Sequence, residues 1–203
     1  GKDPRLDGDG VRDQNTDTSD TETPRDVWPQ YRLDGTHQGR AHTDASLKGE
    51  LSQQWVSVDL NEEYYSASKS SPAVDEDMVY IGADTGNLHA LWRKNGTEAW
   101  SFGTRTSRNG IHGSPAFDDT RVYVGAYDGW LYALEKRTGT MVWESRLGDY
   151  IGASPMLYDG VVYIGVEMSE PAGYLVGCNM TTGEEVMRSQ KFGNHPHSSP
   201  SVD

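Results

Sequence analysis

The sequence repeats itself every 40 to 45 residues, and this period restricts the chain to a few architectures. Ser-Pro pairs mark the repeats most clearly, with prolines at Pro72, Pro115, Pro155 and Pro200. A glycine follows ten residues after each of the first three prolines, at Gly82, Gly125 and Gly165. A period of this length is typical of arrays in which each structural unit packs against its neighbours.

Each of these glycines closes a short run of β-branched and aromatic residues, at 78–81, 121–124 and 161–164. Alternation of this kind, bounded by acidic residues and glycine, predicts half-buried strands. Tight turns are predicted at Asp84-Thr85-Gly86 and Asp128-Gly129. The third repeat has four additional residues within 167–173, which we expect to lengthen one loop without disturbing the strands.

A second set of glycines, Gly96, Gly139 and Gly183, is followed four residues later by Trp100, Trp143 and Met187. Each repeat therefore contains four short strands joined by turns. This pattern predicts an all-β chain, a β-propeller of four-stranded antiparallel blades. A tryptophan at the same place in successive blades would lie between sheets and bury about 150–250 Å². The alternative, a sandwich with core tryptophans, gives no reason for the landmarks to recur at one register.

The stretch 133–143, which runs from Ala133 through Thr138-Gly139 to Trp143, resembles the tryptophan-docking motif of PQQ-like, quinoprotein-type propellers. Weaker copies lie at 90–100 and 177–187. Residues 28–39 resemble the segment before the first blade of secreted members, and Trp55 then takes the docking position. The resemblance implies a ring of about seven or eight blades, so we expect a partial ring of about three to four. It also implies that residues 53–58 form an outer strand, whose partners depend on closure of the ring.

The chain divides into two predicted regions. Residues 1–26 are expected to be a disordered acidic tether, because Leu6 and Val11 are their only large apolar side chains. Residues 27–203 are expected to form the partial propeller, with a lead-in segment at 27–58, blades at about 69–103, 112–148 and 152–193, and the start of a further blade at 197–203. A polar tether before a folded domain favours an extracellular or cell-surface location, secreted or lipid-anchored, with membrane attachment only through a removed anchor.

The charge balance limits the partners. The chain has 18 basic and 31 acidic residues and a net charge of −13, which repels phosphate backbones and argues against a nucleic-acid partner. The acidic surplus fits a salt-rich, halophilic habitat and equally an ordinary acidic secreted protein. The single cysteine, Cys178, excludes an internal disulfide and the c-haem motif of some quinoprotein dehydrogenases.

The innermost strand of a blade begins after each Ser-Pro pair, so the residues just before these pairs are expected to edge the central channel. The connecting loops add further polar side chains. The candidates for a channel-mouth binding site are Lys69, Arg105, Arg108, Asn109, His112, His195 and His197. Such a mouth suits an anion, such as a quinone carboxylate or an acidic peptide. The alternative is that these are solvated loop residues.

The sequence offers little for a metal ion. His195-Pro196-His197 shows no third ligand at a recognisable spacing, so no transition-metal site is predicted. Asp7, Asp9 and Asp13 resemble part of a calcium loop, but Arg5 occupies its first ligand position. An acidic linker is the alternative for this segment.

Two main functions are compatible with the sequence. The first is a non-catalytic extracellular scaffold that binds a protein or peptide through loops and strand edges and needs no cofactor. The second is a fragment of a PQQ-dependent alcohol or sugar dehydrogenase, for which the resemblance implies PQQ and calcium. A sensor domain attached to a kinase is a third possibility. No catalytic residue is assigned, and open blade edges would also permit self-association.

Overall fold

The computed structural model describes residues 28–32, 52–57, 59–61, 69–105 and 110–202. These residues form twelve β-strands in three four-stranded sheets, and all strand pairs are antiparallel. The predicted all-β fold of propeller blades is confirmed. The predicted tether, 1–26, lies outside the described residues.

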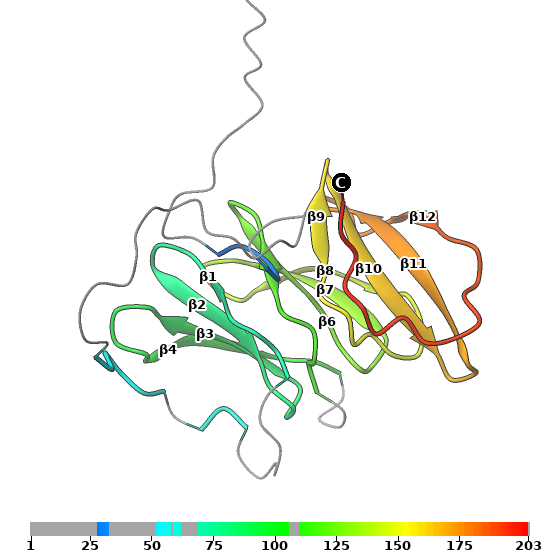
Figure 1. Cartoon of the computed structure of the whole chain (residues 1–203). Coiled ribbons are helices and arrows are strands. Elements are labelled where there is room, and N and C mark those ends of the chain that lie inside the picture. Colours follow the sequence, from blue (N-terminus) through cyan, green and yellow to red (C-terminus); the bar gives the residue numbers. More distant parts are fainter. Residues whose placement is uncertain (1–27, 33–51, 58, 62–68, 106–109, 203) are drawn as a thin grey trace, which may run out of the picture.

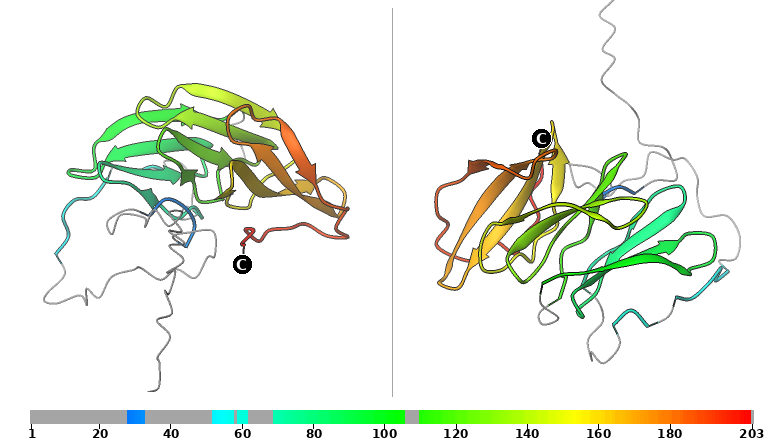
Figure 2. Two further views of the ribbon diagram at one scale, coloured as in Figure 1. Left: turned by 90° about the horizontal axis from the view of Figure 1, so that it is seen from above. Right: turned by 180° about the vertical axis from the view of Figure 1, so that it is seen from behind.

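Each sheet pairs its strands in chain order (Figure 1). The first sheet contains β1 (Ala73–Val74), β2 (Met78–Gly82), β3 (Asn87–Trp92) and β4 (Glu98–Gly103). The second contains β5 (Ala116–Phe117), β6 (Arg121–Gly125), β7 (Trp130–Glu135) and β8 (Met141–Arg146). The third contains β9 (Met156–Tyr158), β10 (Val161–Met168), β11 (Ala172–Asn179) and β12 (Glu185–Arg188). Seen from above, the three sheets follow one another along an arc (Figure 2).

The core consists of two layers, one between each pair of neighbouring sheets. Val122 and Val124 of β6 pack in the layer shared with the first sheet. Tyr123, between them in sequence, packs in the layer shared with the third sheet. Because successive side chains of a strand point to opposite faces, the middle sheet contributes to both layers. Neither face of this sheet could be buried by one blade alone.

The tryptophans make one contact that recurs between neighbouring units. The indole Nε1 donates a hydrogen bond to a backbone carbonyl in the next unit: Trp55 to Arg93 (2.7 Å), Trp100 to Lys136 (3.2 Å) and Trp143 to Met180 (3.0 Å). Each ring also covers a glycine with positive φ, and these glycines are Gly96, Gly139 and Gly183. Trp100 and Trp143 therefore occupy equivalent places between successive sheets.

The Ser-Pro pairs supply a second recurring contact. The backbone N–H of each serine donates to the hydroxyl of the serine in the next pair: Ser71 to Ser114 (3.0 Å), Ser114 to Ser154 (2.9 Å) and Ser154 to Ser199 (3.0 Å). These hydrogen bonds join the segments that lead into the first strand of each sheet. The repeated serines thus connect neighbouring sheets by polar contacts, whereas the tryptophans connect them mainly by packing.

Residues 28–30 cross the first strands of all three sheets. Trp28 forms an antiparallel bridge with Val74 of β1. The carbonyl of Pro29 accepts from the N–H of Phe117 at 2.8 Å. The side chain of Gln30, which is buried, accepts from the N–H of Leu157 at 3.1 Å. This short segment therefore contacts each sheet in chain order.

One prediction about local structure was wrong. The additional residues of the third repeat do not form a longer loop, because β10 and β11 stay paired as far as Met168 and Ala172. The outer strand expected at 53–58 stays a prediction, because its partner would come from closure of the ring and Val58 lies outside the described residues. No strand of the described residues pairs with 52–57, and Trp55 attaches this segment instead. No helix in the described part of the chain is both long and apolar enough to cross a membrane.

Candidate functional site

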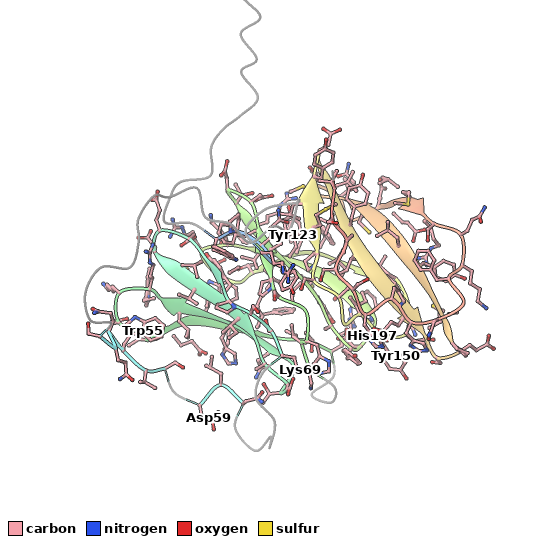
Figure 3. All side chains as sticks on the ribbon, viewed as in Figure 1. Trp55, Asp59, Lys69, Tyr123, Tyr150 and His197 are labelled. Carbon is pink, nitrogen blue, oxygen red and sulfur yellow. The ribbon has the colours of Figure 1, made fainter. Side chains whose placement is uncertain are left out.

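Polar and aromatic side chains gather where the segments leading into the first strands meet the ends of the second strands. We call this group the mouth cluster. Its members are Lys69, Asp84, His112, Tyr127, Tyr150, Glu167, His195 and His197. Figure 3 labels Lys69, Tyr150 and His197, which lie on the same side of the three sheets. The cluster thus combines residues from all three repeats and from the segment after β12.

One end of the cluster is a group of three charged or titratable side chains. Lys69 Nζ lies 3.2 Å from His112 Nε2 and 3.5 Å from Asp84 Oδ2. Burial, and then the charge of Lys69, lower the pKa of His112. An ammonium group has donors only, so the short contact requires His112 Nε2 to accept, which a neutral imidazole can do. Asp84, which is buried, balances the lysine charge.

Aromatic rings connect this group to the far end of the cluster. The rings of His112 and Tyr127 are 4.2 Å apart between centroids, and those of Tyr127 and Tyr150 are 5.9 Å apart. Tyr127 follows β6, where its backbone N–H donates to the carbonyl of Gly110 at 3.2 Å. Burial, and then the charge of Glu167, raise the pKa of Tyr127. Its phenol therefore remains a neutral group between the two charged ends.

The far end of the cluster is built on Glu167 of β10. Its Oε2 lies 3.1 Å from His195 Nδ1, and its Oε1 lies 3.2 Å from His197 Nδ1. Glu167 is held in place because its backbone forms an antiparallel bridge with Tyr150. Sequence reasoning assigned Glu167 to a loop and missed its role. The available signal was the apolar run of β10, which continues the strand past Gly165.

The predicted binding residues divide into three groups. Lys69 and His112 meet at one end of the cluster, and His195 and His197 meet at the other. Arg105 lies elsewhere, since its guanidinium binds Glu144 of β8 and covers the ring of Trp130, 4.3 Å from the centroid. Arg108 and Asn109 lie outside the described residues, as do the calcium-loop candidates Asp7, Asp9 and Asp13.

The donor set of the mouth cluster does not fit a calcium ion of the kind that accompanies PQQ. Calcium takes about six to eight oxygen ligands. Among the described residues the cluster supplies two carboxylates, Asp84 and Glu167, at opposite ends. An ammonium and an imidazole face Asp84, and two imidazoles face Glu167. Within the described residues, both carboxylates of the cluster therefore already face nitrogen-bearing side chains.

Comparison with protein families gives one match. A family model described as outer membrane protein assembly factor BamB matches residues 23–197. A search of curated proteins finds no match for the sequence.

Solved structures with the same fold include two enzymes and one designed protein. The quinohemoprotein alcohol dehydrogenase from Comamonas testosteroni is 23% identical over 82% of this chain, with a TM-score of 0.65. The quinohemoprotein alcohol dehydrogenase ADHIIG from Pseudomonas putida HK5 is 21% identical over 81% of this chain, also with a TM-score of 0.65. The computationally designed Ika4 protein is 16% identical, with a TM-score of 0.58, over 76% of this chain and 89% of its own.

The match to the two dehydrogenases is partial. It covers 27% of the Comamonas testosteroni chain and 26% of the Pseudomonas putida chain, so this chain spans about a quarter of their length. At these identities the likeness concerns the arrangement of the blades alone.

Proposed function

This chain belongs to the PQQ-like β-propeller family whose model is described as outer membrane protein assembly factor BamB, and on that premise we propose that it is a non-catalytic scaffold for a protein or peptide partner. The alternative is a fragment of a PQQ-dependent alcohol or sugar dehydrogenase, in which PQQ and calcium would be the cofactors. A dehydrogenase would need the mouth cluster to hold a cofactor and its ion, whereas a scaffold would need it only to contact a partner.

The observation that supports the scaffold is that each carboxylate of the mouth cluster already has side-chain partners. Asp84 is balanced by Lys69, and Glu167 faces His195 and His197. A dehydrogenase site of the PQQ type needs oxygen ligands grouped around one ion, whereas here the two carboxylates are held apart by aromatic rings. Tyrosine rings bordered by charged groups are typical of protein-recognition surfaces.

The outer strands offer a second surface for a partner. Among the described residues, β4, β8 and β12 each pair along one edge only. Exposed apolar side chains accompany two of them: Met141 and Val142 on β8, and Val186 on β12. An extended peptide can add to such an edge through backbone hydrogen bonds. A second copy of the chain could use the same edges, which is the self-association that an open sheet edge permits.

We place the protein at the cell surface or in another extracytoplasmic compartment. The family description concerns the assembly of outer-membrane proteins, which agrees with this location. The net charge of −13 agrees with the absence of nucleic acid among the proposed partners. Fractionation of the native host, with a membrane-impermeant biotin reagent applied to whole cells, tests the location. Recovery of the protein in the cytoplasmic fraction, with no label on whole cells, would contradict it.

The proposed function is tested with the intact natural protein. After incubation with PQQ and calcium and removal of unbound cofactor, we expect no retained quinone absorption and no dye reduction with primary alcohols or sugars. Retention of one PQQ per chain together with substrate-dependent dye reduction would establish the dehydrogenase instead.

The partner is tested by photo-crosslinking in the native host. A photoreactive amino acid at Tyr150, within the mouth cluster, is compared with the same residue at Tyr158, which is exposed on β9. We expect a discrete crosslinked protein from position 150 and none from position 158. Equal crosslinking from both positions, or none from 150, would contradict a partner at the mouth.

A further inference from the structure

Glu167, His195 and His197 bring three metal-binding donor groups to one point. One carboxylate oxygen and one nitrogen of each imidazole lie within 4.8 Å of one another. The two imidazole rings are stacked, with centroids 6.0 Å apart and planes 18° apart. We propose that these three side chains form a binding site for a divalent transition-metal ion of the zinc type.

A bound cation would stabilise the buried carboxylate of Glu167. The side chain of Glu167 is 3% exposed, and its Oε1 accepts no hydrogen bond from the described residues. Leaving a buried charged oxygen without compensation is costly. Two imidazoles supply compensation only if they are protonated, whereas a divalent cation supplies it together with neutral imidazoles. Glu167 Oε1 lies 3.2 Å from Nδ1 of His197, which is the third proposed ligand.

The backbone presents both histidines to the carboxylate. Pro196 has a fixed φ, and the backbone N–H of His197 donates to the carbonyl of His195 at 3.2 Å, which closes a γ-turn at this proline. Both imidazoles lie beside the Glu167 carboxylate, with their rings stacked on each other. Pro196 packs against Gly173 of β11, and its carbonyl would lie 2.8 Å from a Cβ at Gly165. A larger residue at either glycine would displace the histidine segment.

The histidine segment is held at both of its ends. Before it, the backbone of Phe192 pairs with that of Gly173, with Phe192 N–H donating at 2.8 Å. After it, the hydroxyl of Ser199 accepts from the N–H of Ser154 at 3.0 Å. A ligand set carried by a segment fixed at two points loses little conformational freedom on binding.

The donor types select the kind of ion. Two imidazole nitrogens and one carboxylate oxygen suit zinc and neighbouring divalent transition metals, whereas calcium and magnesium prefer oxygen ligands. Ligand bonds of about 2.0–2.2 Å require the donor atoms to move closer than they are now. His197, whose side chain is 68% exposed, is free to make this movement. Its exposure also leaves a coordination position for water.

Gly152 lies beside Glu167 Oε1 and has no side chain to fill the space there. A Cβ at this position would lie 3.1 Å from Glu167 Oε1 and 3.0 Å from the hydroxyl of Tyr127. The absence of a side chain here leaves room for the carboxylate to turn toward an ion. This glycine belongs to the same position of the repeat as Lys69, His112 and His197, where the other repeats carry polar side chains.

The full chain is prepared without an affinity tag, treated with a chelator and freed of it. ZnSO₄ is then titrated into the chain, and isothermal calorimetry measures the binding. Substitution of Co²⁺ provides a visible spectrum that reports imidazole and carboxylate coordination. We expect one ion per chain with micromolar or tighter affinity. Each of the variants His195→Ala, His197→Ala and Glu167→Gln should weaken binding by at least about tenfold.

The control is His89→Gln, which removes an imidazole that lies on β3 beside Glu98 and should leave the affinity unchanged. Circular dichroism of each variant separates loss of the ligand from loss of the fold, and His197→Ala, at the most exposed ligand, is the variant least disturbing to packing. Absence of saturable zinc binding by the unmodified chain, or equal affinity in the folded His197→Ala variant, would overturn the proposal.

Discussion

The hydroxyl of Ser154 accepts a hydrogen bond from the backbone N–H of Ser114, 2.9 Å away, although the two serines lead into different sheets. Both residues are buried. The same contact joins Ser71 to Ser114 and Ser154 to Ser199. The most visible landmark of the sequence is therefore a hydrogen bond that joins neighbouring sheets.

Replacing Ser154 with alanine should destabilise the chain. The N–H of Ser114 would be left buried without its acceptor, which costs about 1–3 kcal/mol in the free energy of unfolding. Ser101→Ala provides the matched control, because the Ser101 hydroxyl is exposed and bonds Glu98 at 3.3 Å. Its effect should stay within about 0.5 kcal/mol. Denaturant unfolding measures both, and equal effects would contradict a structural role for the serine contact.

The stability of the chain should depend on pH through His112. Burial lowers the pKa of this side chain in the folded state, so below about pH 6.5 the unfolded state binds the proton more readily. The stabilisation associated with neutral His112 is therefore present above the unfolded pKa and is lost as the pH falls through the folded pKa. Unfolding of the unmodified chain and of His112→Asn, measured from pH 8 to pH 5, checks this.

The unmodified chain should lose more stability on acidification than His112→Asn does. The groups that act on His112 are Lys69, Asp84, Glu167 and the ring of Tyr127, and all four are unchanged in the variant, so the difference between the two curves isolates the histidine. Parallel pH dependences of the two proteins would contradict the assignment.

Cys178 should be unreactive in the folded protein. It is fully buried in β11, in the layer between the second and third sheets, and burial raises its pKa to about 11. The thiolate, which is the reactive species, is therefore scarce near neutral pH. A thiol reagent such as Ellman's reagent should modify the protein only at the rate of unfolding, and at once in denaturant. Rapid modification under native conditions would be inconsistent with this packing.

The regular parts of the fold could be predicted because each landmark has one physical cause. The run at 121–124 matches β6, Arg121–Gly125, since alternating side chains of that strand must reach two buried layers. Gly139 and its equivalents mark turns because their φ is positive, which only glycine adopts readily. Local chemistry repeated at one register was enough to predict four strands per repeat.

The far end of the mouth cluster could not be predicted, and Glu167 illustrates the reason. Four additional residues can extend a loop or extend both strands of a hairpin, and residue count does not separate these outcomes. The structure extends the strands, with Met168 paired to Ala172, and this places Glu167 beside His195 and His197. The histidines were 28 and 30 residues away in sequence, so no local spacing linked them to the carboxylate.

Lys69 and His112 illustrate an intermediate case. Their common position before the Ser-Pro pairs predicted that they face the channel, and the structure places their side chains 3.2 Å apart. Asp84, which pairs with both, had been interpreted only as a turn residue. One aspartate can both form part of a turn and take part in an ion pair. Only the three-dimensional arrangement reveals the ion pair of Asp84.

The central structural claim is that tryptophan rings lying on turn glycines hold successive sheets together. Gly139 and Gly160 provide a matched comparison, since both have positive φ, 71° and 73°. A Cβ at Gly139 would lie 2.5 Å from Cε3 of Trp100, whereas a Cβ at Gly160 would meet nothing within 4 Å. Alanine at either position carries a similar backbone cost of about 1 kcal/mol.

The most direct measurement is therefore the free energy of unfolding of Gly139→Ala and Gly160→Ala, determined by denaturant titration of the full chain. We predict that Gly139→Ala is the more destabilised by about 1–3 kcal/mol, the usual cost of overpacking. Equal destabilisation of the two variants would mean that the Trp100 ring does not rest on Gly139, and would contradict the account.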